Sequence, residues 1–462
     1  MLLDADLLTA TLDAALATGG EFAEVFVEDR RTQSAVLDDG RVEELNTSRT
    51  RGAGIRVVTG ETTGFAHTAD LSPEGLRRAA VAAASVARSG SPRGPLSVGD
   101  GTEHDSGALV LPETVDKAGK VELLRRADAA AREAGSAIQQ VTARYNEGRR
   151  RIQIATSDGI NTGDDQVRTL FAVSAVARGD TGLQTGRENV GRTVGFELFD
   201  QVDVAQIAAK AAHRALLKLE ARPAPSGTVP VVIGRGGGGI LFHEACGHGL
   251  EADLVAKGAS VFAGRVGERV ASPLVTLVDD GTMDGEWGRI SVDDEGHAAR
   301  RNVLIQDGEL TEYMWDRLRA RAAGRASSGN GRRQSYRHLP MVRMTNTYVL
   351  GGTEDPDEIV AETPYGVYVA ELGGGQVNTT NGDFVFGTLE AYLIEDGRIG
   401  APLRDANLIG NGPEVLANID ALGNDFAMGM PGTCGKDGQG VPVGDGQPTL
   451  RVTALTVGGT AT

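Results

Sequence analysis

Two histidines, His243 and His248, occur in the motif HExxxH, and their spacing of five residues limits how this segment can fold. In a regular α-helix, residues five apart point about 140° away from each other, whereas residues four apart differ by only about 40°. Both imidazoles can face one point only if the helix accommodates an extra residue. A single-turn π-bulge does this and occurs frequently at functional sites. Gly247 and Gly249 are poor helix formers and favour such local unwinding.

The residue types of this motif are those of a zinc hydrolase. Imidazole nitrogens bind a borderline-soft divalent cation, and a neighbouring carboxylate that does not bind the metal takes a proton from the attacking water. We therefore predict that His243 and His248 are metal ligands and that Glu244 is the general base. The alternative is that these side chains are buried polar groups that satisfy one another in a core helix.

A catalytic zinc ion needs about three protein ligands, and the chain has only two cysteines to offer as the third. Cys246 lies two residues before His248, about 200° around a helix from it, and is better explained as a small buried apolar residue. Cys434 lies in the glycine-rich segment 429–440, which has no apolar periodicity to explain a buried thiol. We predict that its thiolate completes a ligand set of two imidazoles and one sulfur.

Segments around these residues resemble the TldD/PmbA metalloproteases, and specifically their TldD-type catalytic branch. The resemblance covers essentially the whole chain. It implies that His243, His248 and Cys434 are the metal ligands and that Glu244 is the catalytic carboxylate. It also implies a dimer, often a heterodimer with a PmbA-like (TldE) subunit or else a homodimer, whose enclosed site admits only unfolded peptides. The strongest matches are HEACGHGLEAD at 243–253, GNGRRQSYRHLPMVRMTNT at 329–347, VNTTNGDFVFGTLEAYLIEDG at 377–397 and GTCGKDGQGVPVGDGQP at 432–448.

The composition argues against a nucleic-acid-binding or membrane protein. Lysine and arginine total 46 against 63 aspartates and glutamates, a net charge of −17, whereas phosphate binding depends on basic residues. Two cysteines provide no disulfide framework. Residues 1–6 lack the positive charge that begins a signal peptide, and no apolar run reaches the roughly 18 residues that span a bilayer. We expect a cytoplasmic enzyme.

A segment rich in proline, glycine and serine at residues 221–227 is the best candidate for a domain boundary. It follows a helical pattern and precedes an apolar strand at 229–234. We predict an α+β protein of two domains, each with antiparallel sheets and helices. The N-terminal α+β domain would comprise residues 1–222, and the C-terminal metalloprotease domain, with the metal site on a bulged helix, residues 223–462.

Short-range signals predict where several elements begin and end. Asp4, Ser72 and Asp203 precede helical patterns as N-caps, and Pro73 takes the first helical position after Ser72. Residues 92–95, Pro-Arg-Gly-Pro, predict a loop. Asp-Gly pairs between alternating apolar runs predict antiparallel hairpins. These pairs begin at Asp39, Asp158, Asp307 and Asp396.

An arginine-rich segment, residues 317–343, holds eight arginines and no acidic residue. Those at 317–325 are expected on a solvated helical face. The later ones lie in a stretch rich in glycine, asparagine and serine, where they could bind a peptide carboxylate bidentately, and a nearby histidine could donate to the oxyanion of a tetrahedral intermediate or have a structural role. These candidate substrate-binding residues are Arg332, Arg333, Arg337 and His338.

We therefore predict a zinc-dependent metallopeptidase that cleaves unfolded peptides. The glycine- and threonine-rich segment 371–382 could pair its backbone with an extended substrate. Two other functions compete with this prediction. One is a non-catalytic partner-binding subunit, whose structural metal would require a fourth ligand. The other is a cysteine hydrolase that uses Cys434 as nucleophile and a histidine as base.

Overall fold

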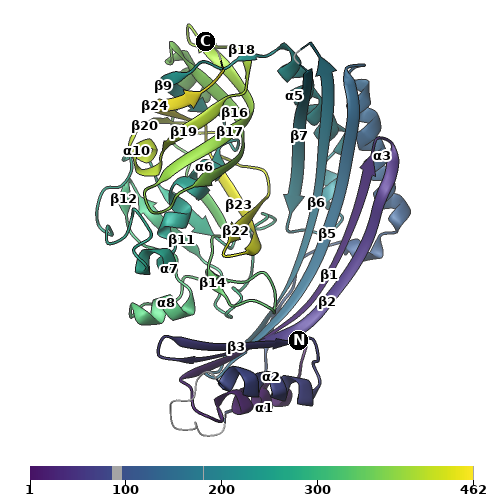
Figure 1. Ribbon diagram of the computed structural model, residues 1–462, viewed down its shortest axis with the longest axis vertical. Coiled ribbons are helices and arrows are strands. Elements are labelled where there is room, and N and C mark those ends of the chain that lie inside the picture. Colours follow the sequence, from purple (N-terminus) through teal and green to yellow (C-terminus); the bar gives the residue numbers. More distant parts are fainter. Residues whose placement is uncertain (86–95, 181, 461–462) are drawn as a thin grey trace.

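The protein is described by a computed structural model over residues 1–85, 96–180 and 182–460. The predicted α+β class is confirmed, because mostly antiparallel sheets carry packed helices in both halves of the chain (Figure 1). The loop predicted at 92–95 lies outside the described residues. No helix among the described residues is long and apolar enough to cross a membrane.

The N-terminal half is built on a seven-stranded sheet whose long strands curve around one side of the molecule (Figure 1). The strand order is β3-β2-β1-β5-β6-β4, and β7 also pairs with β6. All of these pairings are antiparallel except that between β4 and β6. The strands are β1 (Phe22–Asp38), β2 (Arg41–Thr59), β3 (Thr62–Thr68), β4 (Thr102–His104), β5 (Ile138–Thr156), β6 (Asn161–Gly179) and β7 (Gly182–Arg192).

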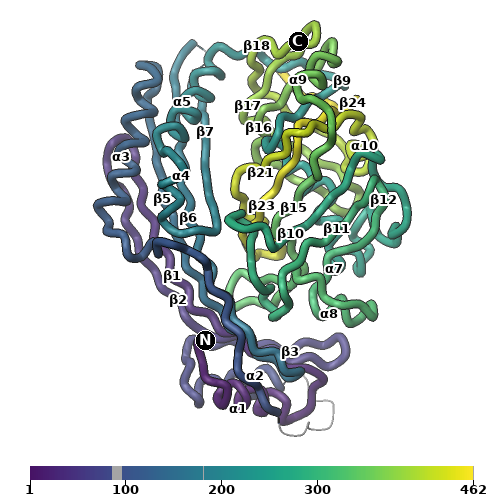
Figure 2. The backbone as a smooth tube through the Cα atoms, turned by 180° about the vertical axis from the view of Figure 1, so that it is seen from behind, coloured from purple at the N-terminus to yellow at the C-terminus, as the bar shows by residue number. Residues whose placement is uncertain are grey.

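Helices cover this sheet at both of its ends (Figure 2). Two pack on β5, β6 and β7, and two pack on β1, β2 and β3. The predicted caps are confirmed, since the side chains of Asp4, Ser72 and Asp203 each accept a hydrogen bond from a backbone N–H of the first turn. The helices of this half are α1 (Ala5–Leu16), α2 (Pro73–Ala84), η1 (Pro112–Thr114), α3 (Lys117–Glu133), α4 (Leu198–Gln201) and α5 (Val204–Glu220).

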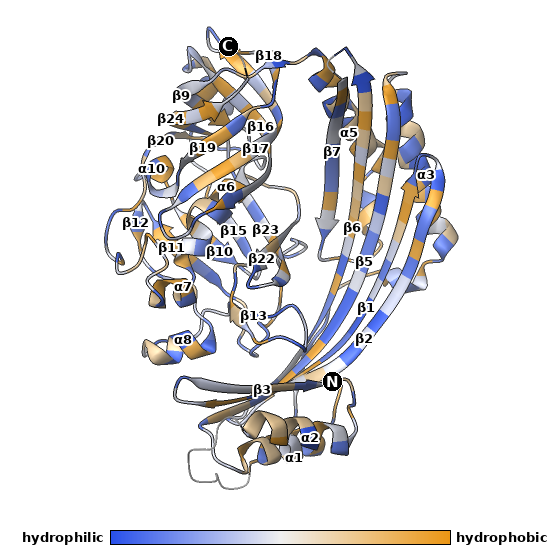
Figure 3. Ribbon diagram, viewed as in Figure 1, coloured by the Kyte–Doolittle hydropathy of each residue, from blue (hydrophilic) through white to orange (hydrophobic). Residues whose placement is uncertain are grey.

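The two faces of the N-terminal sheet have different neighbours because side chains alternate along a strand. In β1, the odd-numbered Val25 and Val27 pack on α1 and α2, and the odd-numbered Ala35 and Leu37 pack near α3 and α5. The even-numbered Phe26 instead joins a small core with residues of the C-terminal half. Hydrophobic and hydrophilic residues alternate along β5 and β6 accordingly (Figure 3). The even-numbered residues of β1 therefore face the C-terminal half.

The C-terminal half contains an eight-stranded sheet, five strands of which close into a barrel. Their order is β16-β9-β24-β19-β17, and β17 pairs back onto β16. β18 and β8 continue from β17, and β20 pairs with β24. The strands are β8 (Arg222–Pro223), β9 (Gly227–Ile233), β16 (Tyr365–Val377), β17 (Asp383–Glu395), β18 (Arg398–Arg404), β19 (Asn407–Asn411), β20 (Ile419–Leu422) and β24 (Leu450–Gly458).

A second sheet packs beside the barrel and carries the hairpin β22–β23, which extends toward the N-terminal sheet (Figure 1). Its strands are β10 (Leu277–Asp280), β11 (Arg301–Gln306), β12 (Glu309–Leu310), β15 (Asn346–Val349), β21 (Ala427–Met428), β22 (Gly432–Lys436) and β23 (Gln439–Gln447), and β13 (Gly331–Arg332) pairs separately with β14 (Met341–Val342). The remaining helices are α6 (Gly239–Phe242), α7 (Ala252–Ala256), α8 (Arg317–Ala322), α9 (Pro356–Ala361) and α10 (Gly412–Ala417).

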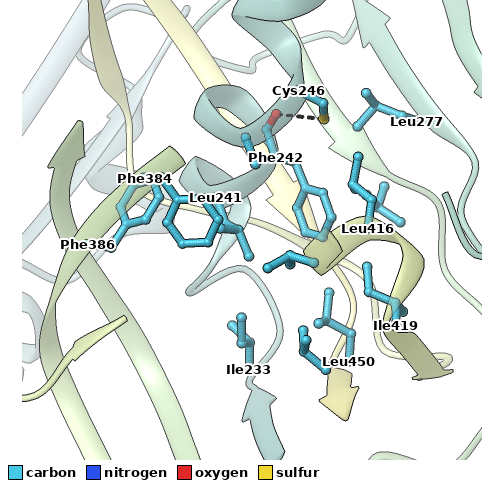
Figure 4. Packing of buried hydrophobic residues seen from close by; sticks show 14 of the residues in the cluster. Ile233, Leu241, Phe242, Cys246, Leu277, Phe384, Phe386, Leu416, Ile419 and Leu450 are labelled. Atoms are coloured by element: carbon cyan, nitrogen blue, oxygen red, sulfur yellow. Dashed lines mark hydrogen bonds between the residues drawn. The ribbon is translucent and has the colours of Figure 1, made fainter. Parts of the chain in front are cut away.

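The four Asp-Gly hairpins predicted from the sequence are confirmed. They connect β1 with β2, β5 with β6, β11 with β12, and β17 with β18. Asp39, Asp307 and Asp396 adopt left-handed φ angles of 47°, 49° and 51°, which tight hairpin turns require. The largest hydrophobic core lies in the C-terminal half, and α6 inserts Leu241 and Phe242 into it (Figure 4). The core of the C-terminal half therefore holds helix α6, which leads into the HExxxH segment.

Candidate metal centre

The HExxxH segment contains the predicted π-bulge. Helix α6 continues into a π-helical turn, η2 (His243–Gly247), and then into a 3-10 turn, η3 (His248–Leu250). Gly247 also fits the packing around this turn, because a Cβ atom there would lie 2.2 Å from Sδ of Met344, whose side chain would have to shift. The spacing of five residues and the glycine beside His248 therefore have the structural consequence expected from the sequence.

Cys434, in strand β22, lies beside the two histidines although it is 186 residues from His248 in the chain. Its Sγ atom lies 3.3 Å from Nε2 of His248. The rings of His243 and His248 are almost perpendicular, at 86°, with their centres 5.0 Å apart. One donor atom from each of the three residues falls within 4.8 Å of the other two, and all three residues are buried. The three predicted ligands thus converge on one point.

A charged network holds His248 from behind. Its Nδ1 atom lies 3.0 Å from Oε2 of Glu251, which also accepts a hydrogen bond from Nζ of Lys436 at 2.9 Å. Lys436 donates a second hydrogen bond to Asp253, at 2.7 Å. With Nδ1–H donated to the carboxylate, Nε2 is the nitrogen that faces Cys434 and that could bind a metal on losing its proton. Glu251 therefore fixes both the tautomer and the orientation of this imidazole.

The electrostatic environment favours a thiolate at Cys434. Burial alone would raise the pKa of its thiol, but hydrogen bonds and charge from His243 and His248 lower this pKa to about 4. Burial would also lower the pKa of His248, but the carboxylate of Glu251 and the sulfur of Cys434 raise it well above its usual value. Burial raises the pKa of Glu251, but His248 and Lys436 have the larger, opposite effect. Together these influences lower the pKa of Glu251 to about 2. The sulfur is thus in the deprotonated form that binds metals.

Glu244 lies on the more accessible side of the cluster. Its Oε2 atom is 4.0 Å from Nε2 of His248, and its side chain is 19% exposed against 10% for His248. A third carboxylate, Asp445 of β23, is buried nearby, and burial and the charge of Glu244 raise its pKa to about 7 although His243 opposes this shift. Glu244 is therefore the carboxylate that a substrate entering from solvent would meet.

Cys246 takes no part in this cluster. Its Sγ donates a hydrogen bond to the carbonyl oxygen of Phe242, and the residue lies in the main hydrophobic core (Figure 4). Burial raises the pKa of its thiol to about 12. These features agree with its prediction as a buried apolar residue. The cluster in the described part of the chain therefore offers three donors and not four.

A second group of acidic residues and histidine, Asp293, Glu295 and His297, is close enough to hold a cation but is already neutralised by other contacts. Glu295 forms an ion pair with Arg56 at 2.7 Å. Asp293 accepts hydrogen bonds from the backbone N–H groups of Glu295, His297 and Gly331. This group therefore connects parts of the fold and is a poor candidate for a metal site.

The four candidate substrate-binding residues have different environments. Arg332 is buried and donates to the carbonyl oxygens of Met344 and Pro442. Arg333 is fully buried, pairs with Glu24 and lies over the ring of Phe26. The remaining two lie at the surface, where Arg337 stacks on Tyr336 and Nδ1 of His338 lies 2.9 Å from Oγ of Ser335. No described contact places any of the four against His243, His248 or Cys434, and their substrate roles stay predictions.

Other arginines of segment 317–343 fasten the C-terminal half to the N-terminal half. Arg317 pairs with Asp158 at 2.6 Å and lies over the ring of Phe22, and Arg321 pairs with Glu21. The side chain of Arg317 is only 18% exposed, so the expectation of a solvated face is wrong at this position. The error arises because the partners lie about 160 residues or more away, which no local pattern reveals.

Sequence reasoning missed Glu251, Asp253 and Lys436. Glu251 had a local signal, because it lies three residues after His248 and residues at this spacing are neighbours on a helical turn. Lys436 lies two residues after Cys434, where side chains of a strand point to the same face. Recognising either signal requires knowing that η3 and β22 lie side by side, which only the fold provides.

Comparison with known proteins places the chain among metallopeptidases. Residues 23–87, 111–219 and 226–459 match domain 1, the central domain and the C-terminal domain of PmbA/TldA metallopeptidases. The chain is 39% identical to a metalloprotease TldD homolog of Haemophilus influenzae over 95% of this chain and 93% of that protein. It is 33% identical to a zinc metalloprotease TldD homolog of Saccharolobus solfataricus over 64% of this chain and 66% of that protein. The structure of TldE from Thermococcus kodakarensis has the same fold, with a TM-score of 0.76, 21% identity and coverage of 98% of this chain and 99% of that chain.

Proposed function

Because the chain belongs to the PmbA/TldA metallopeptidase family, we propose that it is a zinc-dependent peptidase that cleaves unfolded peptides at the site formed by His243, His248 and Cys434. The observation that supports this most directly is the convergence of two imidazoles and one thiolate beside a carboxylate that is not among the three converging donors. This is the composition of a catalytic zinc site with an open position.

The donor set fits a zinc ion in both chemistry and spacing. Zn–S and Zn–N bonds measure about 2.3 and 2.0 Å, so two such ligands of a tetrahedral ion lie about 3.5 Å apart. Sγ of Cys434 and Nε2 of His248 are separated by 3.3 Å. In addition, Nδ1 of the buried His243 has no hydrogen-bond partner among the described residues. The name of the Saccharolobus solfataricus relative also supports zinc.

A zinc ion in this site would polarise the scissile carbonyl group and make a water molecule more acidic. Glu244 would take the proton of the attacking water and then give it to the leaving amine, so a single carboxylate serves as base and then as acid. Its position beside His248 and its partial exposure suit this role. Glu251 would keep the imidazole of His248 oriented throughout through its contact with Nδ1. Lys436 neutralises part of the negative charge of Glu251.

Strand β16 offers a backbone edge for an extended substrate. Its pairing with β9 covers only Val367, Tyr368 and Val369. From residue 373 to 377 the described hydrogen bonds of β16 are made with β17 alone, so the other edge is available. We propose that a peptide adds to this edge, because backbone pairing recognises any extended chain regardless of its sequence. Folded proteins have already paired these groups internally and would be poor substrates.

We further propose that the chain works as a dimer, with a TldE-like subunit or with a second copy. The support is the fold shared with TldE from Thermococcus kodakarensis. An assembly that encloses the site would reinforce the selection for unfolded peptides, because a folded domain could not enter.

The decisive experiment is peptide hydrolysis by the purified chain, alone and with a TldE-like partner, after chelation and after zinc is restored. We expect activity to be lost on chelation and recovered with zinc. Retained activity in the fully chelated protein, together with loss on thiol alkylation, would establish the cysteine hydrolase instead. Stoichiometric zinc without hydrolysis of any unfolded peptide, with or without the partner, would support the non-catalytic subunit.

A further inference from the structure

A cavity of about 450 Å³ lies between the inner face of the N-terminal sheet and the β22–β23 hairpin. The sheet contributes even-numbered residues of β1, β5 and β6, which face the C-terminal half. The hairpin contributes Thr433, which precedes Cys434 in strand β22. Thr433 and Cys434 point to opposite faces of β22, because side chains alternate along a strand, so the hairpin that carries Cys434 also forms one wall of the cavity. Its volume is in the range of ligand sites, roughly 300–1,000 Å³.

The lining of this cavity is strongly positive although the protein as a whole is acidic. It contains five arginines and two carboxylates, so positive side chains outnumber negative ones in the lining. Arg30 of β1 stands directly opposite Arg150 of β5 in the strand register. Like charges at such positions destabilise a sheet, although Glu28 and Asp294 form ion pairs with Arg150 and reduce this effect. The five arginines are Arg30, Arg150, Arg168, Arg332 and Arg333.

Three of these guanidinium groups have no carboxylate partner in the described part of the chain. Arg150 and Arg333 are neutralised by ion pairs with glutamates. Arg168 donates only to amide carbonyl oxygens, those of Trp287, Arg289 and the Gln166 side chain. Carbonyl groups satisfy hydrogen bonds but leave the net charge in place.

Arg332 is in the same situation as Arg168, and among the described residues the side chain of Arg30 has no hydrogen bond or ion pair, although the charge of Glu28 acts on it. Burial, together with neighbouring guanidinium groups, lowers the pKa of Arg168 to about 9, that of Arg332 to about 10, and that of Arg30 below its usual value. Nearby carboxylates, such as Asp294 for Arg332 and Glu28 for Arg30, oppose these shifts only in part. Burial of these charges is therefore costly, and an anion beside them would stabilise them.

We propose that Arg30, Arg168 and Arg332 form a subsite that binds a carboxylate group of the peptide substrate, either an acidic side chain or the C-terminal carboxylate. This inference rests on the proposed peptidase function and adds a preference for acidic substrates. A peptide is favoured because the β22–β23 hairpin, which carries Cys434, also lines the cavity, so both sites lie on one structural element. Guanidinium groups bind carboxylates through paired, charge-assisted hydrogen bonds. Neutral polar residues continue the lining beyond the arginines, at Thr32, Ser34, Asn46, Ser48 and Asn146.

The test uses the full chain, with its partner subunit where hydrolysis requires one, and unfolded peptides of one length and core sequence. One pair of peptides differs by glutamate against glutamine, and a second pair by a free against an amidated C-terminus. We expect kcat/KM to be at least about tenfold higher for one acidic member than for its neutral counterpart. The pair that shows the difference identifies the source of the carboxylate.

Arg30→Gln is the main variant, because Arg30 makes no hydrogen bond that the fold would lose. We expect it to bring the acidic-to-neutral ratio of kcat/KM close to 1, mainly through KM. Arg31→Gln is the matched control: it removes the same charge from the adjacent residue of β1, which is exposed and points to the opposite face. The control is expected to keep the wild-type ratio.

A binding measurement separates this inference from the peptidase function. Fluorescence anisotropy of the labelled peptides with metal-loaded Glu244→Ala protein needs no turnover. Tighter binding of the acidic peptide, weakened about tenfold by Arg30→Gln and unaffected by Arg31→Gln, supports the subsite even if no peptide is cleaved. Equal affinity for acidic and neutral peptides, or an equal loss in both variants, overturns it even if the peptidase is active.

Discussion

Nδ1 of His248 lies 3.0 Å from the carboxylate of Glu251, three residues further along the chain, while Nε2 of the same ring lies 3.3 Å from the sulfur of Cys434. One nitrogen is therefore held by the protein and the other is directed at the candidate metal position. Glu251 is fully buried and receives Lys436 on the same oxygen. The orientation of a candidate metal ligand is thus built into the 3-10 turn that follows the π-helical turn.

Glu251→Gln should weaken zinc binding about 10- to 100-fold without removing a ligand, because a neutral amide replaces the charged carboxylate that orients the imidazole. Competition with a chromogenic chelator measures the affinity. Asp253→Asn is the control, since Asp253 contacts Lys436 but not the imidazole. Unchanged affinity in Glu251→Gln would show that His248 needs no orienting partner.

Cys434→Ser should lose most bound zinc, whereas Cys246→Ala should keep it. Cys434 offers its sulfur to both histidines, and Cys246 instead bonds the carbonyl oxygen of Phe242 inside the core. Metal analysis of the two purified variants is the measurement. Equal zinc content in both would remove Cys434 from the ligand set.

The predictions from sequence succeeded where the signal was local. The spacing between His243 and His248 predicted the π-helical turn, and Asp-Gly pairs predicted four hairpins. Cap residues such as Asp4 also act within their own turn. In these places the residues that determine the geometry are neighbours in the chain, so pattern and physical cause coincide. The division into domains at 222/223 stays a prediction.

The features that sequence could not provide depend on contacts between distant segments. Arg333 pairs with Glu24, 309 residues earlier, and this determines that it is buried and not at the surface. The closure of the barrel through β16 and β17 and the approach of Arg30 to the β22–β23 hairpin are of the same kind. From sequence alone, an arginine in a strand is expected at the surface, and only the fold shows that this face of the strand is covered.

Gly412→Ala should destabilise the fold and distort the π-helical turn. A Cβ atom at this position would lie 2.1 Å from the carbonyl oxygen of Ala245, which belongs to that turn and cannot move aside as a side chain would. We expect a loss of about 1–3 kcal/mol in the free energy of unfolding, together with weaker zinc binding. Chemical denaturation and metal titration measure the two effects.

Gly435→Ala is the matched control for Gly412→Ala. It lies next to Cys434, yet an added Cβ would meet nothing within 4 Å. Its stability and zinc affinity should stay close to those of the wild type. A similar loss in both variants would mean that the close contact with Ala245 is not the cause.

Glu371 should make a contribution to stability that falls as the pH rises through neutrality. Glu371 shares the buried Arg214 with Glu188 and Glu390, so three carboxylates surround one guanidinium. Burial, with the charge of Glu188, raises the pKa of Glu371 to about 7 although Arg214 opposes the shift. The folded state therefore favours the protonated acid, and this contribution is complete below about pH 4.5 and lost above about pH 7.

Glu371→Gln should remove this loss, because the amide stays neutral. Relative to the wild type, the variant should gain stability between pH 5 and pH 8 by on the order of 3 kcal/mol at most, from a pKa difference of about 2.5. Denaturant titrations at several pH values provide the measurement. The same slope with pH in both proteins would show that Glu371 is ionised throughout.

Unfolded chains should be cleaved and folded ones spared, because the available edge of β16 pairs with backbone groups that a folded domain has already used. A digestion series over variants of one small domain, equal in cleavage sites and different in stability, is the measurement. Rapid cleavage of the most stable variant, under conditions where it unfolds too slowly to supply substrate, would contradict the proposed mode of recognition.

The most direct test of the account is hydrolysis of an unfolded peptide by metal-loaded Glu244→Ala protein, compared with the wild type at equal zinc content. We expect the zinc content and the fold to be unchanged, because Glu244 is not one of the three converging donors. We expect the rate of hydrolysis to be lower by about 10²- to 10⁴-fold, because the attacking water loses its base. Wild-type turnover in the fully zinc-loaded variant would contradict the central claim that Glu244 acts on a water molecule at the site of His243, His248 and Cys434.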